Sequence, residues 1–151
     1  MLIKKTVQIN ASPELVWEML TDLEQIKRWN TTVISDEPLS PGPPHVGQIS
    51  KMMIKEGSKM VEYESEISHY QPTSQLSMIL RGGNLGKGPM YLDYQLSTNE
   101  AGTIMNYESK WEPHGIALKL MAQCIAIEVS RTGLTISTSC LEVRDGPQVK
   151  I

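Results

Sequence analysis

Hydrophobic and polar residues alternate along residues 2–9 of the sequence. Ile3, Val7 and Ile9 fall on one face of this segment, and polar side chains occupy most of the other. A period of two is typical of a strand that is buried on one face only. The pattern therefore predicts a strand that ends at Asn10.

Two short helices are predicted directly after this strand. Ser12 is a suitable N-cap with Pro13 at the first helical position, and apolar residues follow at helical spacing. Thr21 and Glu24 fit a second capping box, so a new helix is expected to begin where the first one stops. The second helix would carry Trp29 near its end.

From residue 46 to residue 112 the period of two returns, and the chain changes direction at turn residues. The clearest turn is the dipeptide Gly57-Ser58, which fits a two-residue hairpin loop with glycine at the first central position. Pairing the chain about this turn sets Met52 opposite Tyr63 and keeps both faces in register. Further alternating strands follow, and the whole segment predicts a long antiparallel meander.

After Pro113 the apolar period changes to that of a helix. One apolar stripe at this spacing is formed by Leu118, Ala122, Ile125, Val129, Thr132, Ile136 and Cys140. The stripe predicts a long C-terminal helix of about six turns. Gly133 and the β-branched residues around it weaken the middle of this helix, so a kink or an early end is expected there.

Together these elements predict an α+β fold in a single domain over residues 1–151. The sheet and the long helix must each bury one apolar face. The simplest arrangement is a curved antiparallel sheet of six to seven strands, with two short helices and the long C-terminal helix across its concave face. A chain of 151 residues is long enough for a core with room for a cavity.

Charge and composition exclude several classes of protein. The net charge is −3, and the 14 Lys and Arg are scattered among 17 acids, so nucleic acid is not an expected partner. No segment is apolar enough to span a membrane, and the N-terminus lacks the pattern of a signal peptide. We therefore expect a cytoplasmic protein in which Cys124 and Cys140 are buried thiols, and leave its oligomeric state open.

Catalytic and metal-binding patterns are missing from the sequence. His45, His69 and His114 are far apart and have no metal-ligand spacing, so no metal or other cofactor is expected. There is no nucleophile elbow and no cysteine beside a plausible base, so no catalytic residue is assigned.

The glycine-rich segment 81–89 does not match a phosphate-binding loop, because Lys87 is followed by glycine instead of Ser or Thr. We interpret this segment as a strand connection near the mouth of a cavity. Arg81 or Lys87 could there meet an anionic group of a ligand.

Nine methionines and no phenylalanine make the composition unusual. Flexible thioether side chains adapt to ligands of different shape better than rigid rings do. On strand parity, inward methionines alternate with tyrosines and serines, which suits a sterol-like, polyketide, fatty or isoprenoid ligand. The candidate ligand-binding residues are Trp29, Met52, Tyr63, Ser65, Met78, Met90, Tyr94, Met105, Tyr107, Ser109, Trp111, Met121 and Ile125. The alternative is that the inward methionines only fill a core.

Several motifs resemble the START-like (SRPBCC) superfamily, which includes Bet v 1-like proteins and polyketide cyclase/dehydrase-type proteins. They are V-x-I-x-A-x-P-E-x-V-W at 7–17, T-D-L followed by tryptophan at 21–29, Gly47, and G-T-x-x-x-Y at 102–107. The resemblance implies a helix-grip fold with an apolar cavity between the sheet and the long helix. It also implies that the second short helix caps the mouth of this cavity.

Three functions remain in competition at this point. The first is a binding or carrier protein for a small hydrophobic ligand. The second is a polyketide cyclase or dehydratase in which Tyr63, Tyr94 or Tyr107 donates a proton. The third is a protein-binding module. An enzyme should show an inward acid or histidine with a perturbed pKa, and a protein-binding module should show a large exposed apolar patch.

Overall fold

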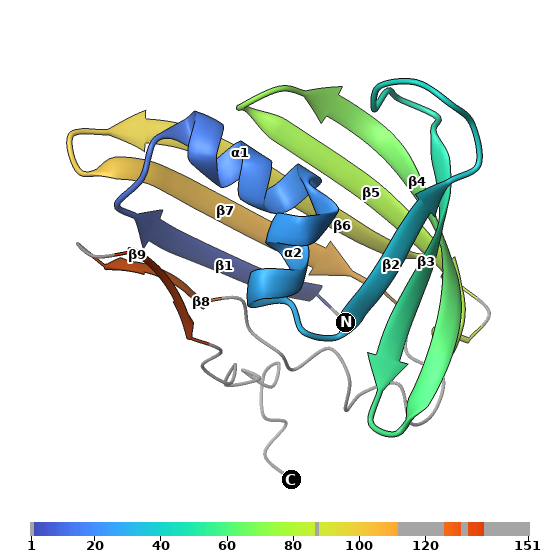
Figure 1. The fold of residues 1–151 in the computed structure, drawn as a ribbon. Coiled ribbons are helices and arrows are strands. Elements are labelled where there is room, and N and C mark those ends of the chain that lie inside the picture. Colours follow the sequence, from blue (N-terminus) through green and yellow to red (C-terminus); the bar gives the residue numbers. More distant parts are fainter. Residues whose placement is uncertain (1, 87, 112–125, 131–132, 138–151) are drawn as a thin grey trace, which may run out of the picture.

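The computed structural model describes residues 2–86, 88–111, 126–130 and 133–137. In this part of the chain, seven antiparallel strands form one sheet in the order β1-β7-β6-β5-β4-β3-β2, as predicted for the sheet (Figure 1). The strands are β1 (Leu2–Ile9), β2 (Val33–Pro38), β3 (Ile49–Glu56), β4 (Lys59–Gln71), β5 (Gln75–Gly82), β6 (Met90–Asn99) and β7 (Gly102–Lys110).

The predicted hairpin register is confirmed. Met52 pairs with Tyr63 across β3 and β4, and Gly57 has the positive φ of 62° that the turn requires. Bulges lie between Val33 and Ser35 on β2 and between Ile67 and His69 on β4. Because a bulge bends and twists its strand, these irregularities favour the curvature of the sheet that Figure 1 shows.

No segment of the sequence was assigned to strand β2, although the predicted six to seven strands left room for it. It is short, it forms an edge of the sheet, and it ends at Pro38, which cannot donate a hydrogen bond to a further neighbour. The signal for it was the β-branched run from Thr31 to Ile34, which favours a strand. Because this strand was not assigned, the residues that β2 adds to the inner face of the sheet were not predicted either.

Helices α1 (Pro13–Thr21) and α2 (Leu23–Trp29) follow each other almost directly. Ser12 caps α1 as predicted, and its hydroxyl accepts a hydrogen bond from the backbone N–H of Leu15 at 3.4 Å. The predicted cap of α2 was wrong. Asp22, not Thr21, is the N-cap, and its carboxylate accepts hydrogen bonds from the backbone N–H groups of Glu24 and Gln25 at 2.8 and 3.1 Å.

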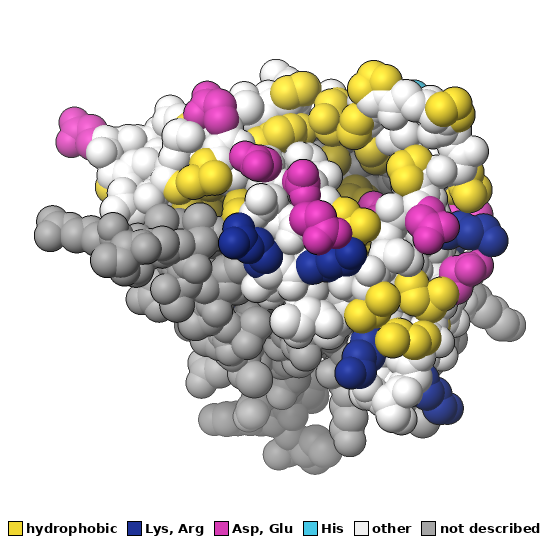
Figure 2. Space-filling model, in the orientation of Figure 1, with side chains coloured by type: hydrophobic (Ala, Val, Ile, Leu, Met, Phe, Trp, Pro, Cys, Tyr) yellow, Lys and Arg dark blue, Asp and Glu magenta, His cyan; other side chains and the backbone are white. Residues whose placement is uncertain are grey.

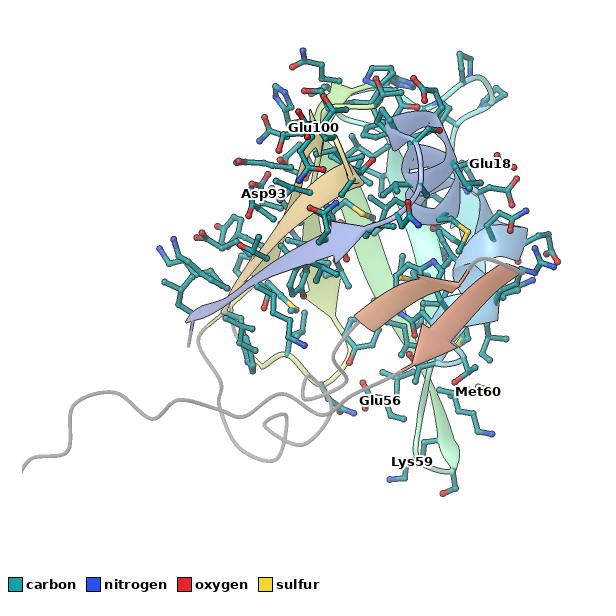
Figure 3. All side chains as sticks on the ribbon, turned by 90° about the vertical axis from the view of Figure 1, so that its left-hand side faces the viewer. Glu18, Glu56, Lys59, Met60, Asp93 and Glu100 are labelled. Carbon is teal, nitrogen blue, oxygen red and sulfur yellow. The ribbon has the colours of Figure 1, made fainter. Side chains whose placement is uncertain are left out.

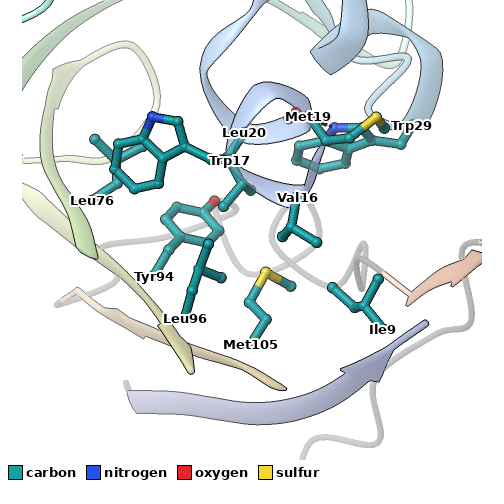
Figure 4. Close-up of a cluster of buried hydrophobic side chains, with 10 residues drawn as sticks. All are labelled: Ile9, Val16, Trp17, Met19, Leu20, Trp29, Leu76, Tyr94, Leu96 and Met105. Atoms are coloured by element: carbon teal, nitrogen blue, oxygen red, sulfur yellow. Dashed lines mark hydrogen bonds between the residues drawn. The ribbon is translucent and has the colours of Figure 1, made fainter. Parts of the chain in front are cut away.

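Both helices lie on the concave side of the sheet (Figure 1). Their buried side chains form one core cluster with β1, β5, β6 and β7, and this cluster includes Trp17 and Met105 (Figure 4). The ring of Trp17 also meets Tyr70 edge to face at 5.4 Å between centroids. A second cluster on β2 to β6 and the segment after β7 contains Met90 and Trp111.

The predicted long C-terminal helix is not shown by the structure. Residues Ala126–Ser130 and Gly133–Ser137 form two antiparallel strands, β8 and β9, so the helix prediction was wrong for these residues. Their β-branched side chains and the glycine that opens β9 favour strands over a helix interior. The remainder of the predicted helix, with Met121, Ile125, Cys124 and Cys140, lies outside the described residues. No helix in the described ranges is long and apolar enough to cross a membrane.

Candidate functional site

A cavity of about 990 Å³ lies between α2 and the inner face of the sheet. Figure 2 shows hydrophobic side chains around a hollow between the helices and the β2–β3 side of the molecule. This volume is at the upper end of the range of about 300–1,000 Å³ that is typical of small-molecule sites. Helix α2 contributes Leu23, Ile26 and Trp29 to the wall.

Seven of the predicted ligand-binding residues lie on the wall of this cavity. They are Trp29, Met52, Tyr63, Ser65, Met78, Tyr94 and Tyr107. Strand parity brought six of them together, because side chains at alternate positions of neighbouring strands share one face of a sheet. Trp29 joins them from α2.

Four other predicted residues face inward but are packed in the interior instead of lining the cavity. Met90, Met105, Ser109 and Trp111 are each at most 2% exposed. Met105 lies in the cluster beneath the helices, and Met90 and Trp111 lie in the second cluster. Parity identified the correct face of the sheet, but it could not distinguish a filled part of that face from a hollow one.

Trp29 holds the end of α2 against α1. Its side chain is 6% exposed, and its Nε1–H donates a hydrogen bond to the carbonyl oxygen of Met19 at 2.7 Å. With this bond made, the ring can line the cavity without leaving a buried polar group unpaired.

One polar cluster lines the cavity where the β3–β4 hairpin meets the segment after β5. The hydroxyl of Tyr63 donates a hydrogen bond to the carboxylate of Glu56, and the side-chain amide of Asn84 donates another. Burial and the bond to Glu56 raise the pKa of Tyr63 to about 12. The phenol therefore stays protonated at neutral pH. Figure 3 shows Glu56 near the hairpin residues Lys59 and Met60.

The glycine-rich segment is shaped by contact with this tyrosine. A Cβ atom at Gly83 would lie 2.3 Å from ring carbons of Tyr63, which only glycine avoids. The segment carries Asn84 and Leu85 onto the cavity wall. Arg81 does not serve an anionic ligand here, because it forms an ion pair with Glu66 at 2.7 Å on the outer face. Lys87 lies outside the described residues.

A second polar cluster lines the β2–β3 side of the cavity. It consists of Asp36 on β2, Gln48 just before β3, Ser50 on β3 and Ser65 on β4. Burial raises the pKa of the Asp36 carboxyl, and a side-chain hydrogen bond with Ser50 acts in the opposite direction. Oδ1 of Asp36 and Nε2 of Gln48 are buried without a hydrogen-bond partner among the described residues. Such orphaned atoms are rare in native structures.

Two tyrosines form part of the wall on β6 and β7. The rings of Tyr94 and Tyr107 lie 5.1 Å apart between centroids, at a tilt of 43°. Burial raises the pKa of Tyr94 well above its ordinary value, and the neighbouring Tyr107 raises it further. Tyr94 is therefore a neutral, amphipathic part of the wall and not a base at neutral pH.

The sequence did not single out several residues that line the cavity. They are Leu23, Ile26, Asp36, Gln48, Asn84 and Leu85. Asp36 was missed with its strand. Gln48 could have been predicted from the sequence, because it lies two residues before Ser50 and four before Met52 and so falls on the same inner face.

The chain belongs to the family described as polyketide cyclase / dehydrase and lipid transport, whose model matches residues 2–131. This match confirms the resemblance that the sequence motifs indicated. No protein with a curated description matches the chain in sequence.

Solved structures that are similar to this chain include the following three. The crystal structure of Ara h 8.0201 has a TM-score of 0.62 at 14% identity, over 78% of this chain and 80% of that chain. Protein CV1439 from Chromobacterium violaceum has a TM-score of 0.64 at 16% identity, over 76% and 82%. The Aha1 dimer from Colwellia psychrerythraea has a TM-score of 0.56 at 19% identity, over 78% and 81%. At such low identities the likeness shows the fold alone.

Proposed function

We propose that this chain binds and carries a small hydrophobic molecule in the cavity between α2 and the sheet. The observation that carries the proposal is a cavity of about 990 Å³ whose wall is mostly apolar and includes a few hydroxyl, amide and carboxyl groups. Walls of this kind favour an apolar ligand by burial of its surface and orient it by a few hydrogen bonds. The lipid transport named in the family description is consistent with such a role.

The ligand contacts of this proposal are the predicted residues on the wall, above all Met52, Met78, Tyr94 and Trp29. The two methionines adapt to the shape of the ligand, and the aromatic rings provide flat apolar surface. A cytoplasmic location, as expected from the sequence, belongs to the same proposal.

Binding of the neutral dye N-phenyl-1-naphthylamine tests the proposal. We expect saturable binding of one dye per chain, with the increase in fluorescence that accompanies transfer to an apolar site. Mass spectrometry of the protein after gentle purification from its native host should then identify the small molecule that it carries. A protein that neither binds the dye saturably nor retains any small molecule would refute the carrier function.

A second candidate function is a cyclase or dehydratase reaction on a polyketide-like substrate. The observation in its favour is Asp36, a carboxyl on the cavity wall whose pKa is raised by burial. A carboxyl that holds its proton more strongly than usual can act as a general acid. Turnover of a polyketide-like substrate that is lost in Asp36→Asn, while dye binding persists, would favour this function over transport.

A protein-binding module has less support. The large hydrophobic side chains that are exposed in the described part of the chain come from many different elements. They are Leu2, Leu15, Ile34, Leu39, Val46, Met60 and Tyr91. Exposed apolar residues distributed in this way are ordinary for a protein surface.

A further inference from the structure

The polar cluster on the β2–β3 side of the cavity has unused hydrogen-bonding capacity. Gln48 is 4% exposed, yet its side-chain Nε2 donates to no atom of the described residues. Oδ1 of Asp36 is likewise buried and receives no hydrogen bond from them. A buried polar group without a partner costs about 1–3 kcal/mol, so two of them in one wall need a reason.

The two side chains belong to one row on the inner face. Gln48 and Ser50 are two residues apart along the chain, and the side chain of Ser50 hydrogen-bonds Asp36. Ser65 pairs with Ser50 across β3 and β4 and extends the row to the next strand. All four residues line the cavity. A ligand in this part of the cavity would lie against both side chains, and rotation of the carboxyl of Asp36 and of the amide of Gln48 would turn the orphaned atoms toward it.

The charges on the wall restrict the ligand further. The charged side chains among the described lining residues are Asp36, Lys55 and Glu56. Glu56 already accepts hydrogen bonds from Tyr63 and Asn84. The row that holds the two orphaned atoms contains no positively charged side chain. A carboxylate or phosphate placed beside Asp36 would meet a like charge. The row thus favours a neutral ligand.

We propose that the ligand is a neutral apolar molecule with oxygen groups at one end, where a hydroxyl donates to Asp36 and a second oxygen accepts from Gln48. The inference rests on the proposed carrier function and narrows its ligand class. It favours hydroxylated molecules over pure hydrocarbons and over ligands that place a carboxylate beside Asp36.

Three compounds with the same ten-carbon chain test the proposal by displacement of N-phenyl-1-naphthylamine. Decane-1,2-diol offers both donors and acceptors, 1,2-dimethoxydecane offers acceptors only, and decanoate is anionic. One hydrogen bond changes affinity about three- to tenfold, so the diol should displace the dye at a concentration lower by about this factor than the diether. Decanoate should be weaker than the diol.

Two variants assign the effect to the two atoms. In Asp36→Ala the preference for the diol over the diether should disappear, and decanoate should gain affinity. In Gln48→Met the diol and the diether should both weaken, because this variant removes the donor that either compound uses. The matched control is Gln95→Met, which makes the same change at an exposed residue outside the cavity lining.

Stability of the ligand-free variants gives an independent readout. Replacing an orphaned polar group by an apolar one of similar shape is nearly neutral or stabilising, so Gln48→Met should unfold at the same temperature as the parent or a higher one. A large drop would assign Gln48 a structural role and overturn the inference.

The outcomes separate this inference from the proposed function. If the dye binds but all three compounds compete equally in the parent and in both variants, the carrier function stands and the polar anchor is refuted. Preferential binding of decanoate also refutes it. If no dye binds, the carrier function fails and the inference fails with it.

Discussion

The indole of Trp29 donates its Nε1–H to the carbonyl oxygen of Met19 at 2.7 Å and so joins the ends of two helices. Met19 lies in the last turn of α1, where carbonyl groups have no partner within the helix. The bond satisfies one of these carbonyls and fixes the angle at which α2 leaves α1. The break between the two short helices is therefore stabilised by the second tryptophan.

Trp29→Phe keeps an aromatic ring on the cavity wall but removes this hydrogen bond. The carbonyl of Met19 would lose its buried partner, so the variant should be destabilised by about 1–3 kcal/mol. Urea unfolding measures this difference in the free energy of unfolding. An unchanged free energy would show that the bond does not hold the two helices together.

Tyr63→Phe should destabilise the fold by about 1 kcal/mol, because Glu56 loses the phenol that donates to it. Because Glu56 is only partly buried, water can donate to its carboxylate in place of the phenol and so reduces the loss of stability. The matched control is Tyr91→Phe at an exposed position on β6, where no change is expected. Equal free energies of unfolding for the two variants would contradict the role of the cluster at Glu56.

Asp36→Asn should change how stability depends on pH. Burial raises the pKa of Asp36, so the folded protein holds this proton more strongly than the unfolded chain. The parent therefore loses stability as the pH rises from about 4 through the raised pKa. Asparagine has no such titration. The stability of the variant relative to the parent should increase over this range and then level off, and a difference that is independent of pH would contradict the assignment.

Local patterns in the sequence were sufficient to predict six of the seven strands of the sheet and part of the cavity wall. Gly57 determines a tight turn, and the tight turn determines which residues pair, so the sequence alone places Met52 opposite Tyr63. Ser12 and Pro13 likewise mark the start of α1 unambiguously. These features depend on neighbouring residues alone.

The features that were missed depend on long-range packing. Asp36 lines the cavity only because β2 pairs with β3, and a short edge strand gives a weak signal in the sequence. Met90 and Met78 lie on the same inner face, yet one is fully buried and the other lines the cavity. Periodicity gives the face, whereas the depth of packing above it depends on residues distant in the sequence, such as Leu85 and Trp111 in the cluster of Met90.

Met90→Trp should be destabilising, because Met90 is 0% exposed in a filled core. Overpacking of this kind costs about 1–3 kcal/mol. The free energy of unfolding from urea titration measures the cost. A variant as stable as the parent would mean that unfilled space lies next to Met90.

The central claim is that the space beside Met78 is a binding cavity, and Met78→Trp tests it most directly. The larger ring can extend into the cavity of about 990 Å³, so stability should change little while affinity for N-phenyl-1-naphthylamine falls at least about tenfold, or about 1.4 kcal/mol. The measurement is a fluorescence titration of the dye against the parent, Met78→Trp and Met90→Trp. Undiminished dye binding by Met78→Trp, or a loss of stability as large as that of Met90→Trp, would contradict the account.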